Sequence, residues 1–214
     1  ELVVAARPPG TDAASQALAR DLTIKLGSLQ TASPGAIRLI DAGEKAQQAD
    51  LAFEAATAYD APAKASLVLK SAKDSSILWS RDFQHPSGRR ADLLQELPYT
   101  AARITGCARE GLNGETSLKP ATLKIYLGAC AQLAEMATAD PQPPIPMLLE
   151  VIEASPRFEP AWSKLLLAEA QMIDPNTPGS QLGTPPISEL REHVAKARKV
   201  NPAMPSAAIA EAQL

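Results

Sequence analysis

The sequence predicts a mixed α/β domain of the α+β class, followed by an all-helical segment of stacked hairpins. In the first half, short apolar runs separated by turn-forming residues are typical of strands. In the second half, from Pro120 onward, every predicted segment has the length of a helix and most are bounded by prolines. Hydrophobic residues make up 45% of the chain but aromatic residues only 4%. The core must therefore consist mostly of small and aliphatic side chains, which favours close packing of helices on helices and on a sheet.

The first half is predicted to follow the order β-α-β-(α)-β-β-β-α. Thr11 or Asp12 can cap the first helix, and Pro98 is expected to kink or split the long last helix. The turn at 73–76 and the spacing of the last three strands predict two antiparallel hairpin connections. The strands are expected at 2–6, 36–40, 51–59, 65–70 and 76–83, and the helices at 13–29 and 89–112, with a short helix within 41–50.

In the second half, similar residues recur at the starts and ends of the predicted helices. A Pro-Pro-Ile sequence opens a helix at 143–145 and again at 185–187, and helices close at Ser155-Pro156 and Asn201-Pro202. Such a pattern is typical of helical hairpins that bury their apolar faces on their neighbours. The five helices are expected at 121–138, 143–155, 158–173 and 185–201, and from 204 to the end.

Charge and hydropathy exclude several classes of partner. The formal net charge is −3, and no cationic surface of the kind that binds nucleic acid is concentrated in the sequence. The basic residues at 89–90 and 196–199 are interpreted as solvated helix faces, so no direct nucleic-acid contact is expected. There is no apolar run of 18 residues. Because a strand begins almost directly after Glu1, we expect the chain to be part of a longer protein.

No catalytic or cofactor motif is present in the sequence. His85 and His193 lack the spacing of a metal site, so both are expected at the surface, and neither a metal nor another cofactor is expected. There is no nucleophile elbow of the form G-x-S-x-G, and carboxylates such as Asp21, Asp41 and Asp60 do not form an organised group. No catalytic residue is therefore assigned, and the chain is not expected to be an enzyme.

The helical half resembles tetratricopeptide repeats. The run Pro160-Ala161-Trp162, with the small and apolar residues up to Ala170, is similar to the first helix of such a repeat. The preceding Leu149, Ile152, Ala154 and Pro156 are similar to the second helix and closing proline of the repeat before it. Repeats of this kind bind their partners in a concave groove, which would here involve Lys124, Gln132, Lys164 and Gln171. Trp79 and Trp162 are interpreted as core anchors.

The first half resembles the TolB-like α/β domain that precedes such repeats in bacterial signalling proteins. The similarity lies in the opening strand and in the segments 19–22, 67–70, 77–83 and 92–97, and residues 125–130 are similar to the first repeat helix. The expected domains are 1–115 (TolB-like) and 116–214 (tetratricopeptide-like). Such regions are typically the periplasmic part of one-pass membrane regulators with a cytoplasmic winged-helix domain that binds DNA. Others follow a nucleotide cyclase.

The resemblance implies a non-enzymatic sensor or protein-interaction region of a bacterial signalling or transcription regulator. Its partner would be a protein, a peptide or a second copy, and the parent protein would be anchored in the inner membrane. The alternative is a regulatory module attached to a nucleotide cyclase or another intracellular enzyme, which would place the chain in the cytoplasm.

The two cysteines bear on this choice. Cys107 and Cys130 lie on two helices that are expected to be neighbours. In an exported domain an even number of cysteines predicts a disulfide, and the resemblance points to the periplasm. In the cytosol the same pair would stay reduced, as two small buried residues. A redox-sensing pair is a third interpretation.

Overall fold

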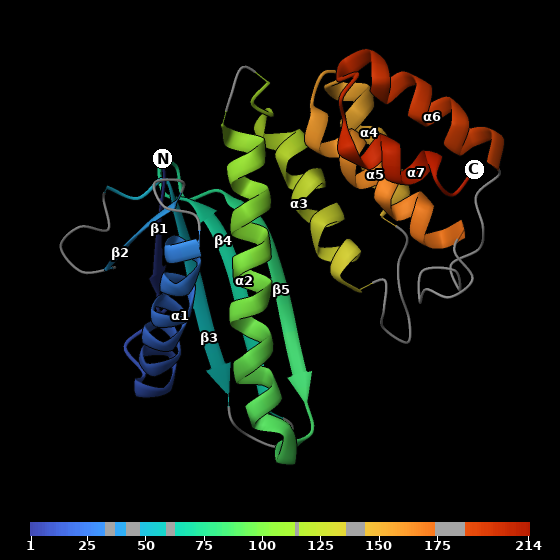
Figure 1. Ribbon diagram of the computed structural model, residues 1–214. Helices are drawn as coiled ribbons and strands as arrows, with labels where there is room; N and C mark the ends of the chain where they lie inside the picture. The colour runs from blue at the N-terminus through green and yellow to red at the C-terminus, as the bar shows by residue number, and fades with distance from the viewer. Residues whose placement is uncertain (33–36, 42–47, 59–62, 114–115, 136–143, 174–186) are drawn as a thin grey trace. The chain divides into compact units, whose positions relative to one another are not determined.

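The computed structural model describes residues 1–32, 37–41, 48–58, 63–113, 116–135, 144–173 and 187–214. The chain divides into two compact units, Glu1–Arg109 and Glu110–Leu214. In the described ranges the structure is mixed α/β, with one five-stranded sheet and seven α-helices (Figure 1). The predicted combination of a sheet-containing half and a helical half is therefore confirmed.

The sheet belongs to the first unit and combines parallel and antiparallel pairing. Its strand order is β2-β1-β3-β4-β5, and β1 is parallel to both β2 and β3. The pairs β3-β4 and β4-β5 are antiparallel, which confirms the two predicted hairpin connections. The strands are β1 Leu2–Arg7, β2 Ile37–Asp41, β3 Leu51–Ala58, β4 Ala63–Ser71 and β5 Ile77–His85.

Helices α1 (Ala13–Ala32) and α2 (Arg90–Leu112) cover the same face of this sheet (Figure 1). They lie side by side, and the Lys25 ammonium of α1 donates a hydrogen bond to the Leu94 carbonyl of α2 at 3.0 Å. Strand β4 shows the resulting two-residue period, since Leu67 and Leu69 on the helix side are fully buried and Lys64 on the other side is exposed. The α/β core therefore lies between the sheet and these two helices.

A local signal accounts for the start of α1 but not for the continuity of α2. The Asp12 carboxylate accepts a hydrogen bond from the Ser15 amide at 2.7 Å, so Asp12, rather than Thr11, caps α1. Of the two predicted effects of Pro98, a kink or a split, the split is wrong, because α2 runs unbroken through the proline. Leu93 and Leu97 before the proline and Ala101 after it are buried at 0–1% exposure. Their burial outweighs the backbone hydrogen bond lost at the proline.

The opposite face of the sheet is covered only over its first two strands. There Val3, Ala5 and Ile40 form a small apolar cluster with Ala49. The predicted short helix within 41–50 falls mainly at 42–47, outside the described residues. Over β3, β4 and β5 no described segment of the first unit covers this face.

In the described residues the second unit contains five complete helices, as predicted. Helix α5 packs against α4, α6 and α7 and carries more buried residues than any other helix of the unit. At its start Phe158 meets Tyr126 of α3 edge to face, with ring centroids 5.0 Å apart. None of the described helices is long and apolar enough to cross a membrane. The helices are α3 Pro120–Glu135, α4 Ile145–Ala154, α5 Glu159–Ile173, α6 Ile187–Val200 and α7 Pro205–Glu211.

The turn between β4 and β5 contains a residue in the left-handed backbone region. Ser75 has φ 58°, a conformation that costs a residue with a Cβ about 1–2 kcal/mol. Glycine relieves this strain but also has greater conformational freedom in the unfolded chain, which offsets part of the gain. Ser75→Gly is therefore expected to raise the free energy of unfolding by about 0.5 kcal/mol. Urea unfolding measures the change. Ser76→Gly is the control and should destabilise, because Ser76 has no such strain to relieve.

Candidate functional site

The uncovered face of β3, β4 and β5 is the most distinctive surface of the first unit. Its side chains come from alternate positions of the three strands, as the register requires. Short side chains form its centre, with Ala56 opposite Ser66 and Ser66 opposite Asp82. We call this surface the open face, and it comprises Arg7, Glu54, Ala56, Lys64, Ser66, Val68, Lys70, Ser80, Asp82 and Gln84.

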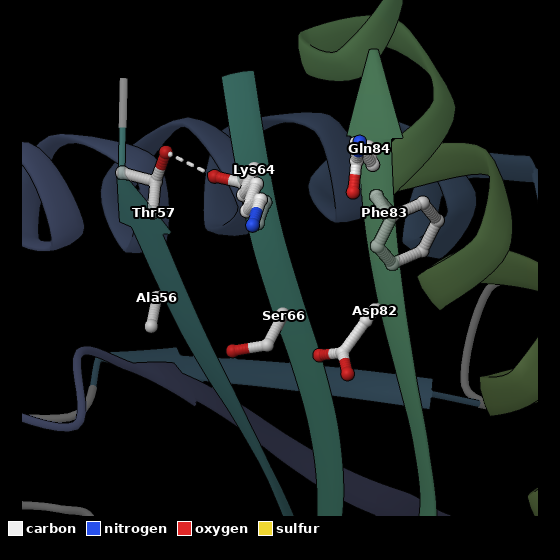
Figure 2. A pocket seen from close by; sticks show the side chains of 8 residues that line it. Ala56, Thr57, Lys64, Ser66, Asp82, Phe83 and Gln84 are labelled. Atoms are coloured by element: carbon white, nitrogen blue, oxygen red, sulfur yellow. Dashed lines mark hydrogen bonds between the residues drawn. The ribbon is translucent and has the colours of Figure 1, made fainter. Parts of the chain in front are cut away.

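A hollow of about 580 Å³ lies at the end of the open face nearest the β3-β4 connection. Figure 2 shows Ala56, Ser66 and Asp82 in a row across the three strands, with Lys64 and Gln84 beyond them. The Thr57 hydroxyl donates to the Lys64 carbonyl at 3.1 Å and so holds the two strands together at this end. The open face contributes five of the lining residues, Ala56, Lys64, Ser66, Asp82 and Gln84, and the intervening strand positions contribute Thr57, Ala65 and Phe83. Such a surface is shaped to receive another surface or an extended segment.

Two opposite charges flank this hollow. Lys64 and Asp82 are both exposed, and within the described residues neither forms an ion pair. They lie on neighbouring strands in diagonal positions, since Lys64 pairs with Gln84 and Asp82 with Ser66. Diagonal positions of this kind are about 7–8 Å apart between Cα atoms. Both charges are therefore available to a partner.

The charges at the other end of the open face are satisfied internally. The Glu54 carboxylate contacts Arg7 at 2.8 Å and Lys70 at 2.5 Å, and all three side chains are partly buried. Burial alone would raise the pKa of Glu54, but hydrogen bonding and charge from Lys70, with the charge of Arg7, outweigh it and hold the pKa below its usual range. This triad therefore pins β1, β3 and β4 together and is not free to bind a partner.

A second depression, of about 470 Å³, lies between α1 and α2 on the outer side of the helix layer. It contains two large hydrophobic side chains that are unusually exposed, Ile24 at 75% and Tyr99 at 69%. Pro98 and Ala102 complete its apolar lining. This depression is the second candidate interaction surface of the first unit.

The four residues predicted to line a repeat groove have different surroundings. Lys124 and Gln171 are exposed on α3 and α5. Lys164 contacts the Glu110 carboxylate at 2.7 Å, and its ammonium lies 5.4 Å from the centroid of the Tyr126 ring. The amide oxygen of Gln132 is buried without a hydrogen-bond partner in the described part of the chain. Lys164 is therefore engaged within the unit, and groove binding by these residues stays a prediction.

The two tryptophans are both buried. Trp79 of β5 is 8% exposed on the helix side of the sheet. Trp162 of α5 is 5% exposed, and its indole N–H donates to the Pro156 carbonyl at 2.8 Å. This bond ties the start of α5 to the turn before it, so Trp162 satisfies its one polar atom while packing.

The histidines are not free surface residues, contrary to expectation. His85 of β5 lies 2.8 Å from a carboxylate oxygen of Glu96 on α2, and Arg81 contacts the other oxygen at 3.0 Å. His193 of α6 lies 2.7 Å from Glu169 of α5, which is 1% exposed and whose second oxygen has no described partner. The hydrogen bond to Glu169 raises the pKa of His193 despite its partial burial.

One sequence signal could have indicated this second pair. Glu169 lies among the apolar residues of α5 that face the core, between Ala168 and Ala170. A carboxylate at such a position requires a cationic or donor partner on the next helix. His193, one residue from the buried Val194, was the candidate for that role.

The cysteines are paired at disulfide-bonding distance, as predicted. Cys107 of α2 and Cys130 of α3 are joined as a disulfide, and neither is free. Both are buried, at 5% and 1% exposure. The pairing is compatible with an oxidising compartment.

The described residues contain no group of three or more His, Cys, Asp or Glu side chains that could hold a metal ion. Comparison with known proteins adds no identification. No protein family, curated protein or solved structure matches this chain. The open face and its hollow are therefore the structural features that bear most directly on function.

Proposed function

We propose that this chain is a non-enzymatic protein-interaction region, and that it binds its partner on the open face of β3, β4 and β5. The observation that carries the proposal is the hollow of about 580 Å³ on a sheet face that no described segment of the first unit covers. In a sheet with helices on one side only, the second face is normally polar and solvated. Here it is polar, but it is also hollowed and flanked by two charges without ion pairs.

The chemistry of the open face favours a polar partner of mixed charge. Ser66, Asp82 and Gln84 offer hydroxyl, carboxylate and amide groups, and Lys64 adds an ammonium. These groups can hydrogen-bond a protein surface or an extended peptide without requiring a large apolar contact. The central alanine and serine residues allow close approach of the partner's backbone.

We further propose that the two units are a TolB-like domain and tetratricopeptide-like repeats of an exported bacterial signalling or transcription regulator. The disulfide-distance pair Cys107–Cys130 supports an exported location. The segments similar to TolB-like domains coincide with β1, α1, β4, β5 and α2. In this setting the open face would transmit the presence of a partner to the rest of the parent protein.

Photo-crosslinking tests the proposed function. A benzoylphenylalanine residue in place of Ser66 should give a discrete adduct in cells that export the chain, and mass spectrometry should identify the attached protein. The same group in place of Lys73, on the exposed β4-β5 turn, is the matched control. Ala56→Arg should abolish the adduct by filling the hollow. Equal adducts at positions 66 and 73, or an adduct insensitive to Ala56→Arg, would contradict the proposal.

A further inference from the structure

We infer that the partner of the open face is a second copy of this chain, bound in a symmetric dimer with Lys64 of each copy against Asp82 of the other. The inference rests on the proposed function and names the occupant of the same surface. Two properties of the open face support it, namely its charge pattern and its centre of small side chains, and its size sets the expected strength of the contact.

The charge pattern is self-complementary. A two-fold axis through an interface brings the same patch of both copies together in reverse order. Lys64 and Asp82 lie diagonally on adjacent strands, so a two-fold axis between them places each lysine opposite the partner's aspartate. Two reciprocal ion pairs then form, and both of these open-face charges, which lack ion pairs within the described residues, are satisfied together. A surface of a single sign would repel its own copy.

The centre of the open face allows two sheets to stack. Sheets pack face to face about 10 Å apart when their facing side chains are of modest size. Ala56, Ser66, Val68 and Ser80 provide such a layer across β3, β4 and β5. The Arg7–Glu54–Lys70 triad is already paired internally and therefore adds little repulsion at the margin.

The size of the open face predicts a weak dimer. Three strands of eight or nine residues form a patch about 14 Å wide and 27 Å long, which is roughly 400 Å². A standard stable interface uses about 800 Å² on each partner. The dimer therefore belongs to the weak, transient class, and it forms where the local concentration of the chain is high. Such an interface suits a partner-dependent regulator.

Charge exchange tests the inference by sedimentation velocity from about 5 to 500 μM. Lys64→Glu makes both flanking charges negative, and Asp82→Lys makes both positive. Each variant is expected to weaken association of the wild-type chain by about tenfold or more, or roughly 1.4 kcal/mol. The double variant should recover the wild-type affinity. An equimolar mixture of the two single variants should form heterodimers, because the two negative positions of one copy then face the two positive positions of the other.

Lys73→Glu is the matched control, since it makes the same change in net charge on an exposed turn outside the open face. It should leave association unchanged. A wild-type chain that remains monomeric at the highest concentration would overturn the inference. Single variants at Lys64 or Asp82 that associate like the wild type would also overturn it. If Tyr99→Ser then abolished association, the contact would lie in the depression between α1 and α2.

These outcomes are separable from those of the cross-linking experiment. An adduct of position 66 with a different protein, together with a monomeric wild type, would preserve the proposed function and overturn the dimer. An adduct between two copies that disappears in the Lys64→Glu variant would support both. Absence of any specific adduct at position 66 would remove the common basis of the two.

Discussion

His193→Ala is expected to lower the free energy of unfolding of the helical unit by about 3–5 kcal/mol near neutral pH. The imidazole is the hydrogen-bond partner of Glu169, at 2.7 Å, and the carboxylate is 1% exposed. Removing one member of a buried ion pair leaves the other charge in the interior without compensation, and the effect is of this size. The Trp162 ring lies beside the imidazole, with centroids 6.5 Å apart. Urea unfolding followed by tryptophan fluorescence therefore reports the change.

Two further variants separate loss of the pair from loss of packing. His85→Ala is the matched control, because its partner Glu96 is 35% exposed and can return to water. It should cost about 1 kcal/mol or less. Replacing both Glu169 and His193 by leucine should recover most of the stability lost in His193→Ala, since an apolar pair leaves no buried charge. A double variant as unstable as the single one would show that the pair does not account for the effect.

The same pair gives the wild-type protein a defined pH dependence. The hydrogen bond to Glu169 raises the pKa of His193 above its ordinary value of 6.5, while burial and Lys196 oppose the shift. A raised pKa means that the stabilisation is fully present below the pKa of the unfolded chain. It is lost as the pH rises through the pKa of the folded state. We therefore expect the free energy of unfolding to fall above about pH 6.5 in the wild type, and this part of the slope to vanish in the double leucine variant.

Reduction of the Cys107–Cys130 pair is expected to lower the free energy of unfolding by about 3 kcal/mol. The disulfide restricts the unfolded chain by closing a loop of about two dozen residues, and the chain-entropy model assigns this value to such a loop. Both cysteines are buried, so the thiols remain enclosed after reduction. Thermal unfolding with and without reductant measures the effect, together with a thiol count on the denatured protein.

The alanine double variant, Cys107→Ala with Cys130→Ala, is the control. Its stability should match that of the reduced protein and should not respond to reductant. Two free thiols in protein exported to an oxidising compartment would contradict the pairing. That result would place the alternative, a regulatory module of an intracellular enzyme, ahead of the exported regulator.

The strands and helices were predictable where local patterns determine them. The alternation in Ala65–Lys70 and the turn at 73–76 indicated the β4-β5 hairpin, and Asp12 indicated the start of α1. The prolines at the helix boundaries of the second half predicted five helices with ends close to those observed. At Pro98 the local signal was misleading, because tertiary burial on both sides of the proline decides the continuity of α2.

The candidate site was much less predictable than the fold. The open face depends on which side of the sheet α1 and α2 cover, and no property of Lys64 or Asp82 in the sequence reveals that choice. The pairing of Glu169 with His193 joins residues 24 positions apart on two helices. The only indication in the sequence is the carboxylate of Glu169 among apolar residues. Its partner can be identified only when the facing helix is known. The cysteine pair, by contrast, needed only two residues on helices that follow one another.

The position of β1 between β2 and β3 has a consequence for the order in which the first unit assembles during synthesis. Three of the four strand pairings join strands that are consecutive in the sequence, and the fourth joins β1 to β3 across α1 and β2. The two antiparallel pairings form over short chain separations, which favours rapid folding, whereas β1 pairs with β2 across 35 residues and with β3 across 47. Until β3 has left the ribosome, however, one edge of the apolar strand β1 has no partner. The nascent chain is most prone to aggregate in that interval, and it becomes protected once β3 pairs with β1.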